Sequence, residues 1–422
     1  MQRIFYLLML SLCLSRLSYA LPYGSFDART LAMGGTAVAS AQSPLGCYYN
    51  PALLATYTQY KESPERTSRI MFPSLTVRYN SSIEDTIDIA DQDLDGQLRT
   101  AISTYNAAQT TSNAQGVVDS AQNLLNALNN IANQDMRLDA NVGFNVSIPS
   151  KKQGGAFCMN VRAVGGGVIT VPQADLALAD RYVQALTYIA TSGTSGTNDP
   201  GLFTGGNIND LTGTLTSSAS ARGLIILQTA LAMSGEFTIA RKKVALGITP
   251  KLLRFSTFDS AVQVNQAKVT ASKDPGDTWQ INFDVGAFMQ LDEHWQTGIA
   301  IKNIIPKTLT TSLQNTISIR PQVRAGIAYQ HKDWLAAFDF DVVPNSPLGN
   351  EAETQYTDFG FEWQAWEALK LRAGYSLNLA ADNKAGFLTG GIGYQTKYFN
   401  IEIAYGTNSI EKAGSLQFSY LF

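Results

Sequence analysis

Few residues of this 422-residue chain have the types and spacing that catalysis or metal binding would need. The chain has two histidines, His294 and His331, and each lies in a short turn beside a carboxylate or a lysine. A Ser-His-acid site needs its base held in a pocket by neighbouring elements, which such a turn does not provide. The sequence also lacks metal-ligand spacing, a phosphate loop and a nucleotide-binding fingerprint. We therefore expect no enzyme, no cofactor and no metal site.

Cysteine is the other reactive residue type, and Cys47 and Cys158 lie beyond the first 20 residues. A disulfide between them is possible in an oxidising compartment. However, Cys47 lies in a segment that we expect to pack inside the fold, whereas Cys158 lies in an expected strand. We favour two buried thiols, and the sequence does not decide whether they are bonded.

The first 20 residues have the pattern of a secretory signal peptide. Arg3 is followed by an apolar run from Ile4 to Leu14 and then by small residues that end at Ala20. This run is too short to span a bilayer as a helix. Cleavage after Ala20 lowers the number of basic residues from 31 to 29, whereas the number of acidic residues stays at 34. The resulting net charge of −5 argues against nucleic acid as a partner.

Most of the chain that follows alternates apolar and polar residues with a period of two. In "DTWQINFDVGAFMQL", Trp279, Ile281 and Phe283 share one face, and Gln280 and Asn282 share the other. This period is typical of half-buried antiparallel strands. We predict about 14 strands, near residues 70–80, 136–149, 155–171, 222–240, 243–259, 277–291, 295–304, 320–331, 333–343, 355–364, 368–379, 385–396, 398–407 and 414–422.

The connections between these strands indicate the kind of sheet, because long and short connections alternate along most of the chain. A soluble sandwich or lipocalin-like barrel has no reason to collect its long loops at one end. An outer-membrane barrel has short periplasmic turns, longer external loops and an apolar face toward lipid. Four tryptophans lie beside the short turns, where an interfacial girdle is expected: Trp295, Trp334, Trp363 and Trp366. The sequence therefore predicts an all-β transmembrane antiparallel barrel of about 14 strands in the bacterial outer membrane.

The last strand, "SLQFSYLF", places Phe418, Tyr420 and Phe422 on one face. We expect this aromatic face to contact outer-membrane lipid. A terminal Phe with aromatic residues at alternate positions also resembles the membrane-insertion signal of bacterial outer-membrane barrels.

A barrel of 14 strands is too wide for its own side chains to fill. The residues predicted to face its interior include many charges: Asp139, Asp284, Arg324, Asp339, Asp341, Asp358, Glu362, Lys370, Arg372 and Glu402. We expect these charges to pair with one another in a hydrated wall. A selective charged filter is the alternative.

The segment before the first strand, residues 21–69, has the composition of a tightly packed plug. Asp27 can cap a short helix that Gly34 and Gly35 end. Pro51 keeps Asn50 out of helical geometry.

Two motifs in this segment resemble the amino-terminal motif of the FadL-type superfamily, and especially that of the TraF-like plasmid-transfer proteins. The first is an "A-R-x-x-A-M-G-G" start, and the second is "Y-N-P-A". The matching residues are Arg29, Ala32, Met33, Gly34 and Gly35, and then Tyr49, Asn50, Pro51 and Ala52. The later stretch "TDFGFEWQAWEALKLRAGYS" also resembles a TraF-like strand pair. The resemblance implies a 14-stranded barrel with an N-terminal plug; FadL itself carries long-chain fatty acids.

Three consecutive glycines, Gly165, Gly166 and Gly167, interrupt the third expected strand. Glycines weaken a strand and permit a kink or bulge. In FadL-type transporters a kink in the third strand opens the wall laterally, so we place a lateral opening here as a hypothesis. A bend that closes the barrel or admits the plug is the alternative.

Two long insertions, near 81–135 and 172–221, carry apolar residues at helical spacing. We expect two helical external loops that either receive a ligand or pack on each other. The expected division of the chain is a signal peptide (1–20), a plug segment (21–69) and a barrel (70–422).

From these features we expect passive transport of small hydrophobic molecules across the outer membrane. The alternative is a structural or assembly component of a conjugal transfer or secretion machine. A general aqueous pore is disfavoured by the plug. The sequence identifies neither the substrate, nor the oligomeric state, nor whether the plug moves.

Overall fold

The computed structural model describes residues 21–56, 68–132, 134–150, 152–193, 199, 201–263, 277–345, 353–380 and 385–422. The predicted signal peptide lies outside the described residues. Within the described part of the chain, no helix combines the length and the apolar character needed to cross a membrane.

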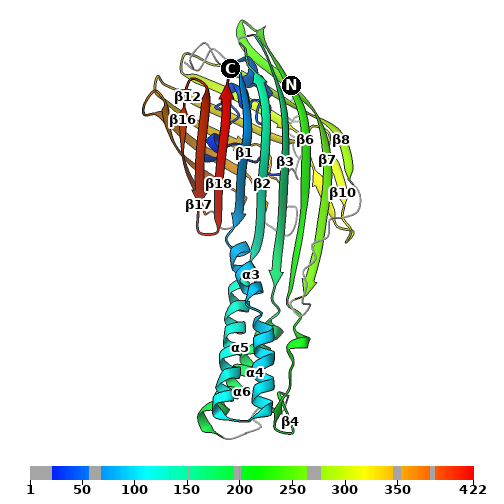
Figure 1. Cartoon of the computed structure of the whole chain (residues 1–422). Coiled ribbons are helices and arrows are strands. Elements are labelled where there is room, and N and C mark those ends of the chain that lie inside the picture. The colour runs from blue at the N-terminus through cyan, green and yellow to red at the C-terminus, as the bar shows by residue number, and fades with distance from the viewer. Residues whose placement is uncertain are drawn as a thin grey trace, which may run out of the picture.

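Fourteen strands of the described chain form one closed antiparallel barrel (Figure 1). They are β1 (Arg69–Asn80), β2 (Asp135–Ile148), β3 (Gln153–Thr170), β6 (Ser218–Ile239), β7 (Lys242–Gln263), β8 (Thr278–Gln290), β9 (Trp295–Lys302), β12 (Gln322–Gln330), β13 (Trp334–Asp341), β14 (Tyr356–Gln364), β15 (Leu369–Asn378), β16 (Phe387–Gln395), β17 (Phe399–Thr407) and β18 (Glu411–Leu421). Because β1 pairs with both β2 and β18, the first and last strands close the cylinder. The predicted 14-stranded antiparallel barrel is confirmed.

Side chains alternate between the two surfaces of the barrel wall. Ile281 and Leu388 are 64% and 62% exposed on the outside, whereas their neighbours Asn282 and Thr389 are buried on the inside. An apolar outer surface and a polar inner surface are the properties of an outer-membrane barrel, and they place this chain in that membrane.

The last strand follows the same rule. The aromatic side chains of Phe418, Tyr420 and Phe422 are exposed on the outer surface, and Gln417 and Ser419 are fully buried. The aromatic face therefore points outward as predicted. Its role as an insertion signal stays a prediction.

The strands differ in length around the barrel (Figure 1). We call β3, β6 and β7 the tall wall, because they have 18, 22 and 22 residues. We call β12 to β17 the short wall, because its strands have 8 to 10 residues. About 9–11 residues suffice for a strand to cross a bilayer, so the tall wall extends beyond the membrane.

The helices project from one end of the barrel, and the C-terminus lies at the other end (Figure 1). The helices are α3 (Ser82–Asp91), α4 (Leu94–Ala107), α5 (Thr111–Ile131) and α6 (Gln173–Ser192). Leu124 and Leu128 of α5 are buried in one apolar cluster with Leu186 and Ile189 of α6. The helical insertions therefore pack on each other, which is one of the two arrangements that the sequence allowed.

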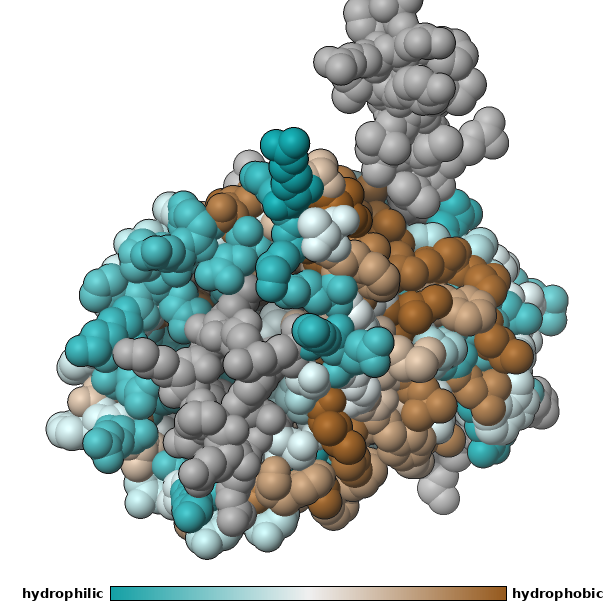
Figure 2. Space-filling view, turned by 90° about the horizontal axis from the view of Figure 1, so that it is seen from above, coloured by the Kyte–Doolittle hydropathy of each residue, from teal (hydrophilic) through white to brown (hydrophobic). Residues whose placement is uncertain are grey.

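The shorter elements are a helix and two 3₁₀ turns in the N-terminal segment, a third 3₁₀ turn and two small hairpins. They are α2 (Ala28–Ala32), η1 (Ser43–Leu45), η2 (Pro51–Ala55), η3 (Thr212–Thr214), β4–β5 (Phe203–Thr204 and Asn207–Ile208) and β10–β11 (Lys307–Thr310 and Thr316–Ile319). Viewed from the end of the barrel that carries the C-terminus, the surface shows hydrophilic and hydrophobic areas side by side (Figure 2).

Candidate functional site

The described part of the N-terminal segment, residues 21–56, is buried inside the barrel, and we call it the plug. Its helix α2 is capped by Asp27, whose side chain accepts a hydrogen bond from Thr30 N at 3.0 Å. Gly34 and Gly35 follow the helix with φ of 72° and 108°, a backbone region that glycine enters at little cost. Burial raises the pKa of the Asp27 carboxyl, and the hydrogen bond from the Tyr49 hydroxyl opposes that rise.

The second motif turns the chain against the barrel wall. Asn50 is extended, and its side chain accepts a hydrogen bond from Ala52 N at 3.1 Å. Its amide nitrogen donates to Val38 O at 2.9 Å and to Ala287 O of β8 at 3.1 Å. Asn50 therefore shapes the turn, joins two parts of the plug and binds the plug to a strand.

A belt of inward-facing glycines makes room for both motifs. An added Cβ at Gly374 would lie 2.0 Å from Gly34 N, and one at Gly286 would lie 1.9 Å from Asn50 Oδ1. The belt comprises Gly154, Gly247, Gly286, Gly298, Gly326, Gly360, Gly374 and Gly391. Three pairs of them are direct neighbours across strands: Gly247–Gly286, Gly298–Gly326 and Gly360–Gly374. The plug backbone thus lies directly against the wall, where any side chain would exclude it.

Charged groups of the short wall also hold the plug. Arg29 of α2 is fully buried and bonds Glu362 of β14 at 2.8 Å. Asp339 of β13 accepts hydrogen bonds from the backbone N–H groups of Ala37 and Val38 at 2.7 and 2.9 Å. Buried charge is tolerated only when it is paired in this way.

The charges predicted to face the lumen largely pair with one another. Arg324 bonds Asp341 at 2.6 Å and Asp358 at 2.8 Å, and its side chain is 1% exposed. Arg372 bonds Glu362 at 2.6 Å and Glu402 at 3.0 Å. Mutual pairing was the expected arrangement, and the plug joins it as a further partner.

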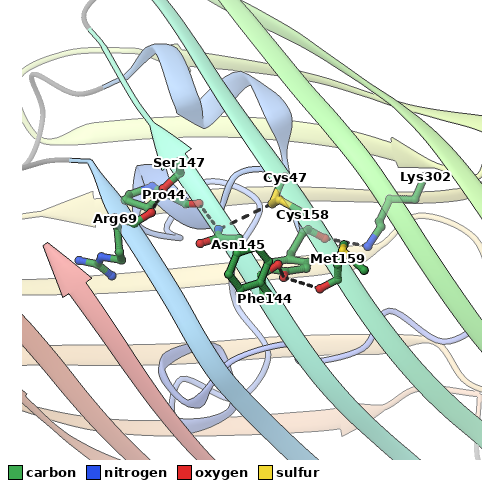
Figure 3. The surroundings of a disulfide bond; sticks show 10 residues. Pro44, Cys47, Arg69, Phe144, Asn145, Ser147, Cys158, Met159 and Lys302 are labelled. Carbon is green, nitrogen blue, oxygen red and sulfur yellow. Dashed lines mark hydrogen bonds between the residues drawn. A yellow bond between two sulfur atoms is a disulfide. The ribbon is translucent and has the colours of Figure 1, made fainter. Parts of the chain in front are cut away.

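The expectation of two buried thiols is wrong, because Cys47 and Cys158 form a disulfide with their Cα atoms 6.7 Å apart (Figure 3). Cys47 lies in the plug and Cys158 faces inward from β3, so the plug loop and the strand meet inside the barrel. Asn145 of β2 supports the loop by donating to Pro44 O at 2.7 Å. The two cysteines are 111 residues apart, and only the position of the plug against β3 brings them together.

A small cavity of about 40 Å³ remains between the plug and the wall. The plug lines it with Pro22, Tyr23, Gly24, Ser25, Leu31, Gly34 and Gly35, and the wall lines it with Thr76, Arg78, Arg137, Asp139, Arg324, Tyr356, Asp358 and Ser376. The Arg78 guanidinium bonds Glu411 and stacks 4.2 Å from the Phe387 ring centre. Arg137 donates to the Tyr356 hydroxyl at 2.9 Å. The described cations of the cavity are thus bound by carboxylates, a phenol or aromatic rings.

The hairpin β10–β11 covers the inner face of the tall wall. Leu309, Ile317 and Ile319 of the hairpin are buried in one cluster with inward-facing side chains of β6 and β7, such as Leu224 and Phe255. Sequence reasoning assigned no role to this connection. The sequence carries a signal for this hairpin, because Leu309, Ile317 and Ile319 alternate with polar residues inside the connection.

The three predicted lateral-opening glycines lie within an unbroken ladder. Gly165, Gly166 and Gly167 pair with β2 on one side and with β6 on the other. An added Cβ at Gly165 would lie 3.1 Å from the ring of Phe258, and one at Gly223 would lie 2.2 Å from it. Gly165 therefore accommodates an aromatic ring on the outer surface in this structure. A lateral exit here would require these strands to separate, and it stays a prediction.

Fold and site together define an outer-membrane type of β-barrel that holds residues 21–56 in its interior. Residues 47–341 match the model of the family described as "F plasmid transfer operon, TraF, protein", and the chain belongs to this family. This match includes the "Y-N-P-A" motif and begins after the glycine pair of the first motif.

Several solved structures of channels are similar in fold at low sequence identity. The toluene transporter TodX of Pseudomonas putida is 12% identical, with a TM-score of 0.47 over 96% of this chain and 98% of its own. The CymD monoaromatic hydrocarbon channel is 11% identical, with a TM-score of 0.48 over 95% and 98%. A Pseudomonas aeruginosa FadL homologue is 11% identical, with a TM-score of 0.46 over 96% and 99%. No curated protein matches the sequence.

Proposed function

We propose that this protein is a passive transport barrel that carries small hydrophobic molecules across the outer membrane. The observation that carries the proposal is the cavity between plug and wall. The rings of Tyr23 and Tyr356 and the side chain of Leu31 form the apolar part of its lining, and charged groups such as Arg324 and Asp358 form much of the rest. Its guanidinium groups are bound within the protein. A solute without charge meets no unpaired cation there among the described residues.

Passage requires part of the plug to move, because an apolar cavity that binds benzene has about 150 Å³ and this cavity is smaller. The disulfide holds the plug at Cys47. The leading segment 22–26 is held only by noncovalent contacts among the described residues. Tyr23 Oη donates to Tyr49 O, Arg162 donates to Pro22 O at 2.9 Å, and the Arg324 guanidinium lies 4.4 Å from the centre of the Tyr23 ring. We infer that this leading segment is the gate, while the rest of the plug stays in place.

Uptake measurements test the proposal. Cells with and without the protein are given labelled toluene and, separately, a labelled long-chain fatty acid. We expect protein-dependent uptake of at least one probe. The rate of uptake should be higher for Tyr23→Ala, since this change removes an aromatic ring of the gate segment and the hydrogen bond that its hydroxyl donates. The control is Tyr188→Ala, because Tyr188 lies exposed on α6, away from the lumen.

A second candidate function is supported by the family and by the helices. The family description names a plasmid transfer operon, and α3 to α6 project from the barrel with an apolar core of their own. This candidate is a component of a conjugal transfer or secretion machine. If the barrel is folded in the outer membrane and neither probe is taken up, the result would contradict transport of these solutes. A fall in plasmid transfer from donor cells that lack the protein would then support the second candidate.

A further inference from the structure

The hairpin between β6 and β7 extends beyond its neighbours at the end opposite the helices. Gln153, the first residue of β3, pairs with Gly235, and Lys152 O accepts a hydrogen bond from Glu236 N. Beyond Glu236, β6 has no strand partner on that side among the described residues. On the other side Val244 of β7 pairs with Met289, close to the end of β8. In this part of the hairpin, residues 236–239 pair with residues 242–245, and we call residues 236–243 the hairpin tip.

The two residues at the turn of this tip adopt a left-handed backbone conformation that costs free energy for residues other than glycine. Ala240 and Arg241 have φ of 49° and 66°, the conformation of a two-residue turn that Asn-Gly or Gly-Gly enters more easily. A strained position that carries Arg in place of Gly suggests that the side chain has a role.

The tip combines exposed cations with exposed apolar side chains. Arg241, Lys242 and Lys243 are exposed at the turn, and exposed Lys152 is adjacent, since its carbonyl accepts a hydrogen bond from Glu236 N. One acid, Glu236, pairs with Lys243 at 3.0 Å, but the lysine side chain remains 76% exposed. An exposed pair of this kind neutralises little of the local positive charge.

The apolar side chains of the tip are exposed on the outer surface of the barrel. Phe237 and Ile239 are 53% and 50% exposed, and they continue the outward column of Leu231 and Met233 on β6. The hairpin tip therefore carries apolar groups on the membrane side and cations at its end. Lys and Arg beside such groups place their charge at the level of lipid headgroups.

Positive charge is concentrated at this turn among the described turns at the same end. The β8–β9 turn carries Asp292 and Glu293, and the β12–β13 turn sets Asp333 beside Lys332. The chain as a whole has a net charge of −3, so the basic tip does not follow from general composition.

We propose that the hairpin tip, together with Lys152, binds the headgroups of anionic phospholipids in the periplasmic leaflet and anchors the tall wall there. Short turns face the periplasm in barrels of this kind. Each Lys or Arg near an anionic membrane surface adds to lipid binding. The outward position of Phe237 and Ile239 favours lipid over an acidic periplasmic protein.

The test uses the full-length protein in detergent with phosphatidylglycerol or phosphatidylcholine, and native mass spectrometry measures the bound lipid. The variant Lys152→Gln/Lys242→Gln/Lys243→Gln keeps the Ala240–Arg241 turn. We expect its affinity for phosphatidylglycerol to fall by about 10- to 100-fold, with little change for phosphatidylcholine. In the wild type, raised salt should reduce the preference for phosphatidylglycerol.

The matched control is Lys332→Gln/Lys397→Gln, which removes cations from two other turns at the same end and should leave the preference unchanged. Equal loss in the control, or an unchanged preference in the tip variant, would overturn the proposal. Binding of poly-glutamate to the wild-type tip with the affinity of phosphatidylglycerol would overturn the assignment to lipid. A second variant, Phe237→Gln/Ile239→Gln, should weaken binding of both lipids, and unchanged binding would contradict the membrane-facing geometry.

Discussion

The tall and short walls of this barrel hold the same plug by different chemistry. The tall wall is joined to it by the Cys47–Cys158 disulfide and has an apolar inner face that the hairpin β10–β11 covers. The short wall is joined to it by the Arg29–Glu362 ion pair and by hydrogen bonds to Asp339. The attachment to one wall therefore can be removed while the other remains, which makes the contribution of each measurable.

The glycine belt is common to both walls. Gly154 of the tall wall and Gly374 of the short wall each allow the plug backbone to approach the strand. Close approach thus determines where the plug lies, whereas the covalent bond and the ion pairs determine how firmly each wall holds it.

The largest expected effect is on the short wall. Arg324→Leu leaves Asp341 and Asp358 buried without their cation, and removal of one partner of a buried pair costs about 3–5 kcal/mol. Urea unfolding in vesicles, followed by tryptophan fluorescence, measures this change in the free energy of unfolding. Lys332→Leu, at an exposed turn of the same wall, is the control. Equal effects of the two changes would mean that the pairs contribute nothing specific.

The next largest effect is on the tall wall. Cys47→Ala/Cys158→Ala removes a link between residues 111 apart, and loss of a native disulfide costs about 2–5 kcal/mol. Hydrogen exchange should become faster in η1 and η2, while α2 stays protected by its contacts with the short wall. Faster exchange in α2 to the same extent would show that the two attachments are not independent. Reduction of the wild type should reproduce the pattern.

Substitutions in the glycine belt should weaken each wall separately. An added Cβ at Gly154 would lie 2.1 Å from Leu54 O, whereas one at the adjacent Gly155 would have its nearest neighbour at 3.8 Å. Overpacking costs about 1–3 kcal/mol, so we expect Gly154→Val to destabilise the protein and Gly155→Val to change it little. Gly374→Val and Gly390→Val form the corresponding pair on the short wall, because the nearest neighbour of a Cβ at Gly390 lies 3.6 Å away. Thermal unfolding compares the stability of the four variants. Equal stability within both pairs would contradict the claim that the belt glycines are needed for close approach of the plug.

The smallest effect on stability concerns the strand that closes the barrel. Phe422→Ala keeps the backbone hydrogen bond from Phe422 N to Ser68 O. An exposed substitution of this kind changes the free energy of unfolding by within about 0.5 kcal/mol. The rate at which newly made chains become folded barrels should nevertheless fall, which pulse-labelling with heat-modifiable gel migration measures. Phe359→Ala, an outward aromatic of β14, should leave that rate unchanged. Equal rates for both variants would mean that the terminal residue is no insertion signal.

The barrel could be predicted from the sequence because its signal is local. Each strand must alternate apolar and polar residues, because one side faces lipid and the other faces polar groups. Neighbouring residues such as Ile281 and Asn282 show this alternation. The predicted strands agree with the 14 strands of the barrel, and they differ mainly at the ends of long strands such as β6 and β7.

The site was only partly predictable, because its contacts join distant parts of the chain. The sequence reveals the two motifs around Gly34 and Asn50. It does not reveal that the glycines of the belt, against which these motifs pack, form a group. A glycine on the polar face of a strand, such as Gly286, was visible in the pattern. That eight such residues lie at the level of the plug depends on strand register, which local alternation does not specify.

The sequence by itself determined the barrel, its outward aromatic strand and the presence of a segment suited to fill it, since these follow from the period and composition of short stretches. The tertiary structure alone decided that Cys47 is bonded to Cys158, that Arg29 reaches Glu362 and that the tip of β6–β7 extends past its neighbours. The physical reason is the same in each case. Alternation determines which face a residue occupies, whereas closure of the barrel and strand register determine which distant residue it meets.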